Sequence, residues 1–295
     1  MPFTVPLSRT FAASLCLVDG PATSLDVALW VGTVADALIL VDDPDERGLT
    51  MRDAWATAEG DEAPLYLAAS TLLQATGLRT HAQLERPFER LAASSWSLGL
   101  HGDQRLRLWH GWEASPADRG NPVDRGLVSG LALAQAMIHD HGFIVSVNVG
   151  AMARFRSRYS ALVYLRALAW LTGAGTPKSW KRTPPGKGKP VTVTVPVDEL
   201  HRALGTDSLK MMGDWNAKAF GRDATGGPVH EDLASAGIRL RTEWILGTAG
   251  YGARQVPKGL RLTVARIAGA ERRPPTRRPR QSSQASSRSS ASSIP

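Results

Sequence analysis

The sequence has few of the features that mark secreted, membrane-spanning or disulfide-bonded proteins. Its 295 residues include one cysteine, Cys16, which excludes an internal disulfide framework and a cysteine-based zinc site. The longest apolar stretch, residues 27–41, contains Asp36 and is too short to span a bilayer. The N-terminus lacks a basic segment followed by a clean apolar run, so we expect no secretory signal. These observations predict a cytoplasmic protein without membrane association.

Motifs for catalysis and metal binding are also missing. The run Gly186–Lys189 lacks the glycine spacing and the Ser or Thr of a phosphate-binding loop. Neither a Gly-x-Ser-x-Gly elbow nor a His-Glu-x-x-His helix occurs. The four carboxylates within residues 42–46 lack EF-hand spacing, which favours a solvated turn over a metal site. We therefore expect no enzymatic activity, no metal and no cofactor.

Positive charge, by contrast, is in excess and unevenly distributed. The formal net charge is +8, and hydrophobic residues, at 43%, suffice for a folded core. Residues 178–189 carry five basic side chains and no acidic one, and residues 271–295 carry six arginines and one glutamate. Both segments are too polar to fold alone, and they predict a polyanionic partner such as nucleic acid. Trp180, in the first of them, either anchors the segment or stacks on an unpaired base, and anchoring is favoured.

The stretch Arg154–Leu171 predicts a helix that is apolar on nearly every side. Three arginines at alternate positions begin it, and only Ser160 and Arg166 are clearly polar in the remainder. A helix of this kind is usually buried between other elements, and Gly173 provides its natural end. We expect this helix to join two similar modules.

The chain before this helix has the order of elements of a winged helix-turn-helix. Residues 63–76 and 80–94 are expected to form two helices, the second of which is kinked or begun by Pro87. Residues 96–98 and 105–109, separated by a glycine-containing turn, alternate as the strands of a hairpin do. Two helices followed by a basic hairpin form the helix-turn-helix and its wing.

A short repeat links the two sides of the predicted buried helix. The segment FERLAASSWSL around Leu91 matches HEDLASAGIRL around Leu233. This alignment pairs Glu89 with Glu231, and it places apolar residues of one segment opposite apolar residues of the other. Internal similarity of this kind predicts a duplicated structural unit.

Two further features recur in the same order around this match. A helix ending in glycine precedes each copy, LLQATG at residues 72–77 and LHRALG at residues 200–205. An alternating, arginine-bearing strand follows each copy, at residues 105–108 and 260–264. The second copy is longer by an insertion at residues 206–227, which is expected to form a helix of its own.

Two motifs carry a resemblance to a known family. The S-R-Y-x-x-x-x-Y-L-R segment at residues 157–166 and the V-P-V-D-E-L-x-x-A-L-G segment at residues 195–205 resemble those of bacterial plasmid replication initiator proteins. In that family the second motif opens the second of two winged helices. The resemblance covers roughly residues 63–267. The chain departs from the family at Gly226–Pro228, which interrupts the expected recognition helix, so either residues 215–224 or residues 229–236 would enter the groove.

The resemblance implies an α+β, mostly helical fold with two tandem winged helix-turn-helix domains joined by a long buried helix. A first winged-helix domain is expected in residues 1–150. The linking helix and a second winged-helix domain are expected in residues 151–268, and a disordered basic tail in residues 269–295.

The expected DNA contacts follow from this organisation. A helix in the major groove reads base edges, whereas contacts to phosphates fix position and register. The reading residues expected in the first module are Arg79, Thr80, His81, Gln83, Arg86 and Arg90. Those expected in the second are Lys210, Asn216, Lys218 and Arg222. The wing residues, which are expected mostly at phosphates, are Arg105, Arg107, Arg254, Lys258 and Arg261.

The resemblance thus implies a sequence-specific, double-stranded DNA-binding plasmid replication initiator. It would bind repeated origin sites, promote opening of the adjacent DNA, and recruit a host replication initiator and replicative helicase. A monomer–dimer equilibrium, a role in copy control and a plasmid- or nucleoid-associated location are also implied.

Two other functions remain open at the level of sequence. The first alternative is a winged-helix transcriptional regulator. The second is a rolling-circle nicking enzyme, suggested by His139–His141 beside Tyr159 and Tyr164. The nicking enzyme is disfavoured because Asp140 breaks the His-apolar-His pattern and both tyrosines lie in the predicted core helix.

Overall fold

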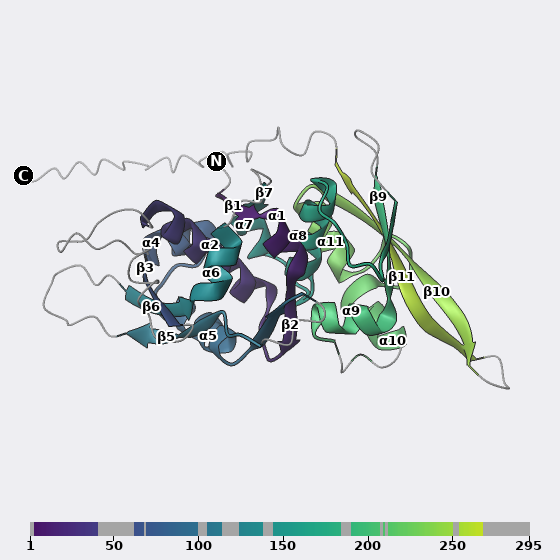
Figure 1. Cartoon of the computed structure of the whole chain (residues 1–295), viewed down its shortest axis with the longest axis horizontal. Coiled ribbons are helices and arrows are strands. Elements are labelled where there is room, and N and C mark those ends of the chain that lie inside the picture. Colours follow the sequence, from purple (N-terminus) through teal and green to yellow (C-terminus); the bar gives the residue numbers. More distant parts are fainter. Residues whose placement is uncertain are drawn as a thin grey trace, which may run out of the picture.

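Figure 1 shows the fold as a computed structural model, which describes residues 3–40, 62–67, 69–99, 105–113, 124–137, 144–183, 190–206, 209, 212–249 and 254–267. Several predicted features lie outside the described residues, namely the carboxylates of residues 42–46, the His139–His141 group, Lys210, residues 184–189 and the tail at 269–295. Helices and strands are mixed throughout, so the α+β class is confirmed.

The elements before residue 153 alternate between short strands and helices. In order they are β1 (Thr4–Ser8), α1 (Arg9–Ser14), β2 (Leu15–Asp19), α2 (Ser24–Leu40), β3 (Glu62–Leu67), α4 (Ala69–Thr76), α5 (Ala82–Ala92), β4 (Ser95–Leu98), β5 (Trp109–Glu113), β6 (Asp124–Ser129), α6 (Gly130–Met137), β7 (Ile144–Asn148) and α7 (Val149–Met152). The remaining elements are α8 (Ser160–Leu171), β8 (Lys181–Thr183), β9 (Val191–Pro196), α9 (Val197–Leu204), α10 (Met212–Trp215), the π-helical turn η1 (Asn216–Phe220), α11 (Pro228–Ser235), β10 (Ile238–Ala249) and β11 (Arg254–Arg266).

Two sheets have the same strand order relative to the sequence. In the sheet β3-β6-β5, the first strand pairs with the third, which pairs with the second. The order β9-β11-β10 repeats this pattern, and the short strand β8 is added beside β9. Helices lie between the first and second strands in both cases, α4 and α5 in the first unit (residues 62–129), and α9 to α11 in the second unit (residues 190–267). The sequence repeat therefore coincides with a repeated order of elements.

The aligned residues occupy corresponding elements in the two units. Leu91 lies in α5 and Leu233 in α11, and both side chains are fully buried. The preceding helices α4 and α9 are followed by Gly77 and Gly205, whose φ angles of 77° and 61° are left-handed. Such a conformation ends a helix and is adopted most readily by glycine. The match between the two helix ends is thus confirmed.

The third predicted part of the repeat, an alternating strand that follows each copy, is wrong. Residues 260–264 lie in β11, the third strand of the second unit, and the strand with the same place in the first unit is β6. Residues 105–108 precede β5 instead, and Leu106 forms an isolated antiparallel bridge with Trp96. The two backbone hydrogen bonds of this bridge measure 2.9 Å each. The predicted hairpin is therefore reduced to one pair of residues.

Two helix predictions also need correction. Residues 63–67 form part of strand β3 rather than a helix, because they pair with β6 and bury Ala63, Leu65 and Leu67 on one side. The helix expected from Arg154 begins only at Ser160, since residues 153–159 form turns. Helix α8 has 12 residues and is shorter than predicted, although its burial from Ser160 to Trp170 is confirmed.

The buried apolar side chains form one continuous cluster through both units, and α8 lies in its middle (Figure 1). Helices α1, α2, α7, α9 and α11 all contact α8. The two units are thus distinguished by their repeated order of elements and not by separate cores. Because they share a packed interior, their relative position is fixed by the fold.

Candidate nucleic-acid interface

The six residues before α8, Arg154–Tyr159, form a junction segment that contacts α2 and the turn before it on one side and α11 of the second unit on the other. On the side of α2, the Ser24 hydroxyl donates to the Ser157 carbonyl at 2.7 Å and accepts from the Ala161 N–H at 3.0 Å. The Arg158 guanidinium donates to the Gly20 carbonyl at 2.7 Å. Ser24 therefore satisfies one of the backbone N–H groups that the first turn of a helix leaves without an internal partner.

The other side of the junction segment is held by α11 through a buried carboxylate. Asp232 accepts hydrogen bonds from the N–H groups of Arg156 at 3.0 Å and Ser157 at 2.9 Å. It also accepts one from the Ser160 hydroxyl at 2.6 Å. The negative charge lies at the N-terminus of α8, where the helix dipole stabilises it. These contacts join α8 and the second unit rigidly.

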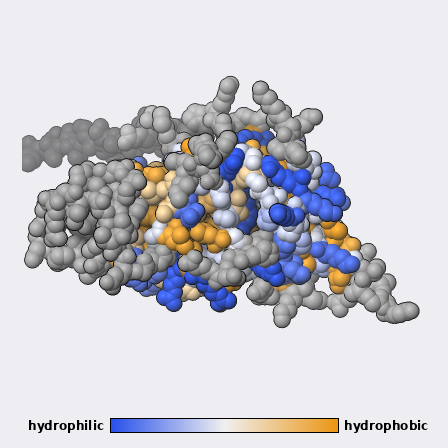
Figure 2. All heavy atoms as spheres, viewed as in Figure 1, coloured by the Kyte–Doolittle hydropathy of each residue, from blue (hydrophilic) through white to orange (hydrophobic). Residues whose placement is uncertain are grey.

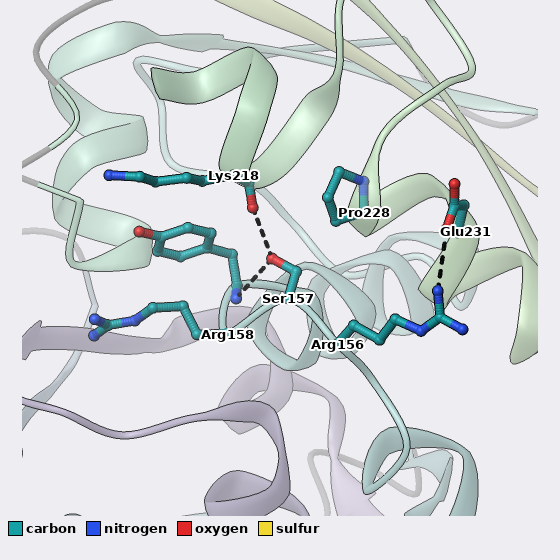
Figure 3. A pocket seen from close by; sticks show the side chains of 7 residues that line it. Arg156, Ser157, Arg158, Lys218, Pro228 and Glu231 are labelled. Atoms are coloured by element: carbon teal, nitrogen blue, oxygen red, sulfur yellow. Dashed lines mark hydrogen bonds and ion pairs between the residues drawn. The ribbon is translucent and has the colours of Figure 1, made fainter. Parts of the chain in front are cut away.

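A basic pocket of about 490 Å³ opens above the junction segment. Its walls come from the junction segment, η1 and the first turn of α11 (Figure 3), and the lining residues are Arg156, Ser157, Arg158, Tyr159, Lys218, Pro228 and Glu231. Three of these carry a positive charge. The ion pairs that Glu231 makes with Arg156, at 4.0 Å, and Asp214 makes with Lys218, at 3.9 Å, are long and solvent-exposed. Such pairs contribute little, so the pocket remains attractive to an anion such as a DNA phosphate.

The predicted reading residues of the first unit gather at the start of α5. Arg79, Thr80, Gln83 and Arg86 are all exposed there, and so is His81. The Gln83 side-chain oxygen accepts from the N–H groups of Arg79, at 2.7 Å, and Thr80, at 3.3 Å. Gln83 therefore closes the turn before α5, and a two-bond contact to adenine would have to break this turn.

Arg90, the sixth residue predicted for this unit, differs from the others because its guanidinium is paired with a buried carboxylate. Its guanidinium makes two hydrogen bonds to the Asp26 carboxylate, at 2.8 and 2.5 Å. The Asp26 side chain is fully buried, and this bidentate hydrogen bonding is the main cause that raises the pKa of Arg90. Arg90 thus neutralises a buried charge at the start of α2.

The remaining predicted contacts are distributed over the second unit and the strand regions. Lys218 and Arg222 are exposed on and after η1, whereas Asn216 is half-buried. Arg105 and Arg107 are exposed on either side of the Trp96–Leu106 bridge. The other three predicted wing residues, Arg254, Lys258 and Arg261, lie on β11. Lys218 is the predicted residue that lines the basic pocket.

Three aromatic residues proposed for other roles are buried. Trp180 is 6% exposed, its indole N–H donates to Glu199, and its ring meets Trp170 edge to face. The prediction that Trp180 anchors the basic segment at residues 178–189 is therefore confirmed, and the alternative, stacking on an unpaired base, is wrong. Tyr159 and Tyr164 are 5% and 2% exposed, and burial raises the pKa of both phenols. A buried phenol with a raised pKa is a poor nucleophile for cleaving DNA.

Arg156 and Arg158 line the basic pocket but are not among the DNA contacts predicted from the sequence. The sequence places these arginines at the start of the predicted helix. The structure instead bends the chain at residues 153–159, and this turn presents both side chains to the pocket. The alternation itself was the available signal, because period-two spacing is not typical of one helix face.

No three metal-ligating side chains lie close enough together to hold an ion within the part of the chain that the structure describes. Among the same residues, no helix combines the length and the apolar character needed to cross a membrane.

The structure is similar to a crystal structure of the Pi initiator protein in complex with iteron DNA. The TM-score is 0.49 and the sequence identity 17%, with 90% of this chain and 98% of that chain covered. No protein-family model and no curated protein sequence matches the chain. The function proposed below therefore rests on this chain's own sequence and contacts.

Proposed function

We propose that the chain is a double-stranded DNA-binding plasmid replication initiator that uses two winged-helix modules. The repeated order of strand, helices and two paired strands on both sides of the buried helix α8 is the observation that carries this proposal. In a winged helix-turn-helix the last helix before the hairpin lies in the major groove. The corresponding elements here are α5 in the first unit and the α10–α11 region in the second.

In the first unit the start of α5 is the part proposed to enter the groove. It exposes Arg79, Thr80, Gln83 and Arg86, and the apolar side of the helix is buried through Leu84, Phe88 and Leu91. Arginine is suited to base edges in the major groove, and Gln83 holds the turn that carries Arg79 and Thr80.

In the second unit we propose that η1 and the turn after it contact DNA, and not α11. Helix α11 packs on α8, where Asp232 accepts from the Ser160 hydroxyl, and its exposed side chains include the acidic Glu231. Glu231 would repel phosphates, whereas Lys218 and Arg222 would attract them. The basic pocket next to Lys218 would receive one phosphate and fix the register of the second module.

The initiator role rests on the resemblance of residues 157–166 and 195–205 to plasmid initiators. Recruitment of a host initiator and helicase, a monomer–dimer equilibrium, copy control and a plasmid-associated location belong to the same proposal. A winged-helix transcriptional regulator would have the same DNA-binding surface. The two roles differ in the DNA that is bound, since initiators of this kind bind tandem repeats and a regulator binds one site at a promoter.

The test is selection of bound sequences from random duplexes, followed by footprinting on the DNA beside the gene. Enrichment of a motif that occurs there in tandem next to an AT-rich stretch supports initiation. A single inverted repeat over a promoter supports the regulator, and failure to enrich any sequence contradicts both. A covalent protein–DNA adduct that is lost in Tyr159→Phe or Tyr164→Phe would support the nicking enzyme.

A further inference from the structure

The outer side of the sheet β8–β9–β11–β10 is separate from the helical surfaces proposed above to enter the major groove, and of the predicted wing residues it carries Arg261. Helices α9 and α11 pack against the inner side, so the outer side faces solvent (Figure 1). Successive side chains of a strand point to opposite sides. The inner positions of β9, for example, are the buried Val191, Val193 and Val195, and the outer ones include Thr192 and Thr194.

The pairing registers identify the residues on the outer side. Lys181 and Thr183 of β8 lie opposite Thr194 and Thr192 of β9, which lie opposite Arg261 and Thr263 of β11. These in turn lie opposite Glu243 and Arg241 of β10. The same side continues with Pro196, Gly259 and Ile245. Figure 2 shows hydrophobic residues beside hydrophilic ones where β10 and β11 extend from the molecule. We call the polar part of this side the sheet face, and its residues are Lys181, Thr183, Thr192, Thr194, Arg239, Arg241, Glu243, Arg261, Thr263 and Ala265.

The sheet face is basic, rich in hydroxyl groups and without aromatic residues. Glu243 is its one acid and is paired with Arg261 at 2.7 Å. Lys181, Arg239 and Arg241 are exposed and form no ion pair with another described residue. The surface therefore combines unpaired positive charge with hydrogen-bonding hydroxyl groups.

This composition identifies the class of partner. The centres of protein–protein interfaces are poor in charged residues and rich in aromatic ones, whereas surfaces that bind DNA are polar and strongly positive. Arginine and threonine side chains are frequent donors to phosphate oxygens. Without aromatic side chains the sheet face has no platform on which unpaired bases could stack. It fits the sugar–phosphate backbone of a duplex better than a protein or a single strand.

We propose that the sheet face binds the backbone of a second DNA duplex, independently of base sequence. The residues proposed to contact phosphates are Arg239, Arg241 and Lys181. Arg239 and Arg241 are two positions apart on one strand, so their Cα atoms are about 7 Å apart along the edge of the sheet. Because the helices and the sheet face lie on opposite sides of the second unit, one molecule holds two DNA segments at the same time.

The experiment is a bridging assay with two duplexes of the same random sequence, each about 40 base pairs or roughly four helical turns. One duplex is fixed to beads and the other carries a fluorophore. The full chain is bound to the beads, and retention of the fluorescent duplex is measured. In Arg239→Glu/Arg241→Glu we expect this retention to fall by about fivefold or more, with protein bound to the beads within about twofold of the wild type.

Glu243→Gln provides a control of opposite sign. It removes the one acid of the sheet face and releases Arg261, so we expect more of the second duplex to be retained. Far-ultraviolet circular dichroism checks that both variants are folded. If the double variant does not fold, the proposal is tested by whether Glu243→Gln retains more of the second duplex than the wild type.

Three results would overturn the proposal. The first is that the wild type retains no second duplex. The second is that the double variant retains as much of the second duplex as the wild type. In that case either two protein molecules hold the two duplexes together, or the partner of the sheet face is an acidic protein. The third is an equal loss of both duplexes, which would make the face part of a single DNA site. None of these results depends on the sequence selection, so failure of the proposed function is detected separately.

Discussion

Asp26 and Asp232 are buried carboxylates, and each has a partner far away in the sequence. Asp26, at the start of α2, is paired with Arg90 of α5, and Asp232 of α11 holds the junction segment. A buried charge is tolerated only with such partners, so removing one partner costs much more than a surface change. The residue scale therefore offers direct tests of how the units are joined.

Arg90→Ala should act on stability rather than on DNA affinity. It leaves the buried Asp26 carboxylate without its guanidinium, and we expect the free energy of unfolding to fall by about 2–4 kcal/mol. Arg86→Ala, on the exposed side of the same helix, is the matched control and should leave stability within about 0.5 kcal/mol. Urea unfolding measures both, and a binding titration well below the melting temperature should find weaker DNA binding only in Arg86→Ala. Equal stabilities of the two variants would contradict the role given to Arg90.

Asp232→Ala should loosen the attachment of α11 to α8. The N–H groups of Arg156 and Ser157 lose a buried acceptor, which we expect to cost about 2–3 kcal/mol. Glu231→Ala removes the adjacent, exposed acid and should change stability by less than about 0.5 kcal/mol. Hydrogen exchange of the Arg156 and Ser157 amides should accelerate in Asp232→Ala. Unchanged protection there would show that other contacts hold the junction segment.

His230 should make stability depend on pH. It is buried in α11, its ring accepts from or donates to the Thr242 hydroxyl at 3.1 Å, and burial lowers its pKa below the usual 6.5. The unfolded chain therefore binds a proton more readily than the folded one. The stability that the buried, neutral His230 contributes is fully present above about pH 6.5, and it declines as the pH falls towards the folded-state pKa. Urea unfolding at pH 7.5 and 5.5 should show a smaller loss in His230→Gln than in the wild type, and parallel losses would contradict this.

Sequence reasoning at this scale identified exposed cations but not their partners. Arg79, Arg86 and Lys218 are exposed as expected, since they lie on the polar side of predicted helices. Arg90 follows the same pattern, yet its partner Asp26 is 64 residues earlier and is brought near only by the packing of α2 on α5. Long-range ion pairs of this kind leave no signal in local periodicity.

At the scale of elements, the two helix ends in the repeat have different surroundings. An added Cβ at Gly77 would meet no atom within 4 Å, whereas at Gly205 it would lie 2.7 Å from the Leu17 carbonyl oxygen of β2. Both glycines have left-handed φ angles, so alanine is strained at either position. The second helix end is thus also a close contact with the N-terminal part of the chain.

Gly77→Ala and Gly205→Ala should therefore differ in cost. We expect about 1 kcal/mol for Gly77→Ala, the strain of the left-handed conformation alone. For Gly205→Ala we expect that strain plus overpacking, or about 2–4 kcal/mol in total. Chemical unfolding of the two variants measures the difference. Similar losses would mean that β2 moves away easily from α9.

Elements with a strong apolar pattern could be predicted from the sequence. Helix α8 is an example, because nearly every residue from Ala161 to Leu171 is apolar and the sequence therefore predicts a buried helix. Strand β3 could not be predicted, since Ala63 and Leu65 are good helix formers and only pairing with β6 makes them a strand. The junction segment was missed for a related reason, as its turns are fixed by Ser24 and Asp232 from other elements.

At the scale of the whole molecule, net charge should set the affinity for any DNA. Truncation after Ala270 removes six arginines and one glutamate. We expect weaker binding to specific and random duplexes alike, and a shallower dependence of log affinity on log salt, by about 0.9 for each phosphate that the tail no longer neutralises. Titrations at salt concentrations from about 50 to 200 mM, over which such effects are large, would measure this salt dependence. A loss confined to one sequence would contradict a purely electrostatic role.

The shared core has a consequence for the geometry of the DNA site. Asp232 and Ser24 hold the junction segment from opposite sides, and Asp26 of α2 is paired with Arg90 of the first unit. The two units therefore cannot turn independently to follow a rotated target. Inserting about 5 base pairs, roughly half a helical turn, between the two halves of a bound site would carry one half to the far side of the duplex. Affinity should then drop to that of a single unit and recover when the insertion reaches a full turn of the double helix.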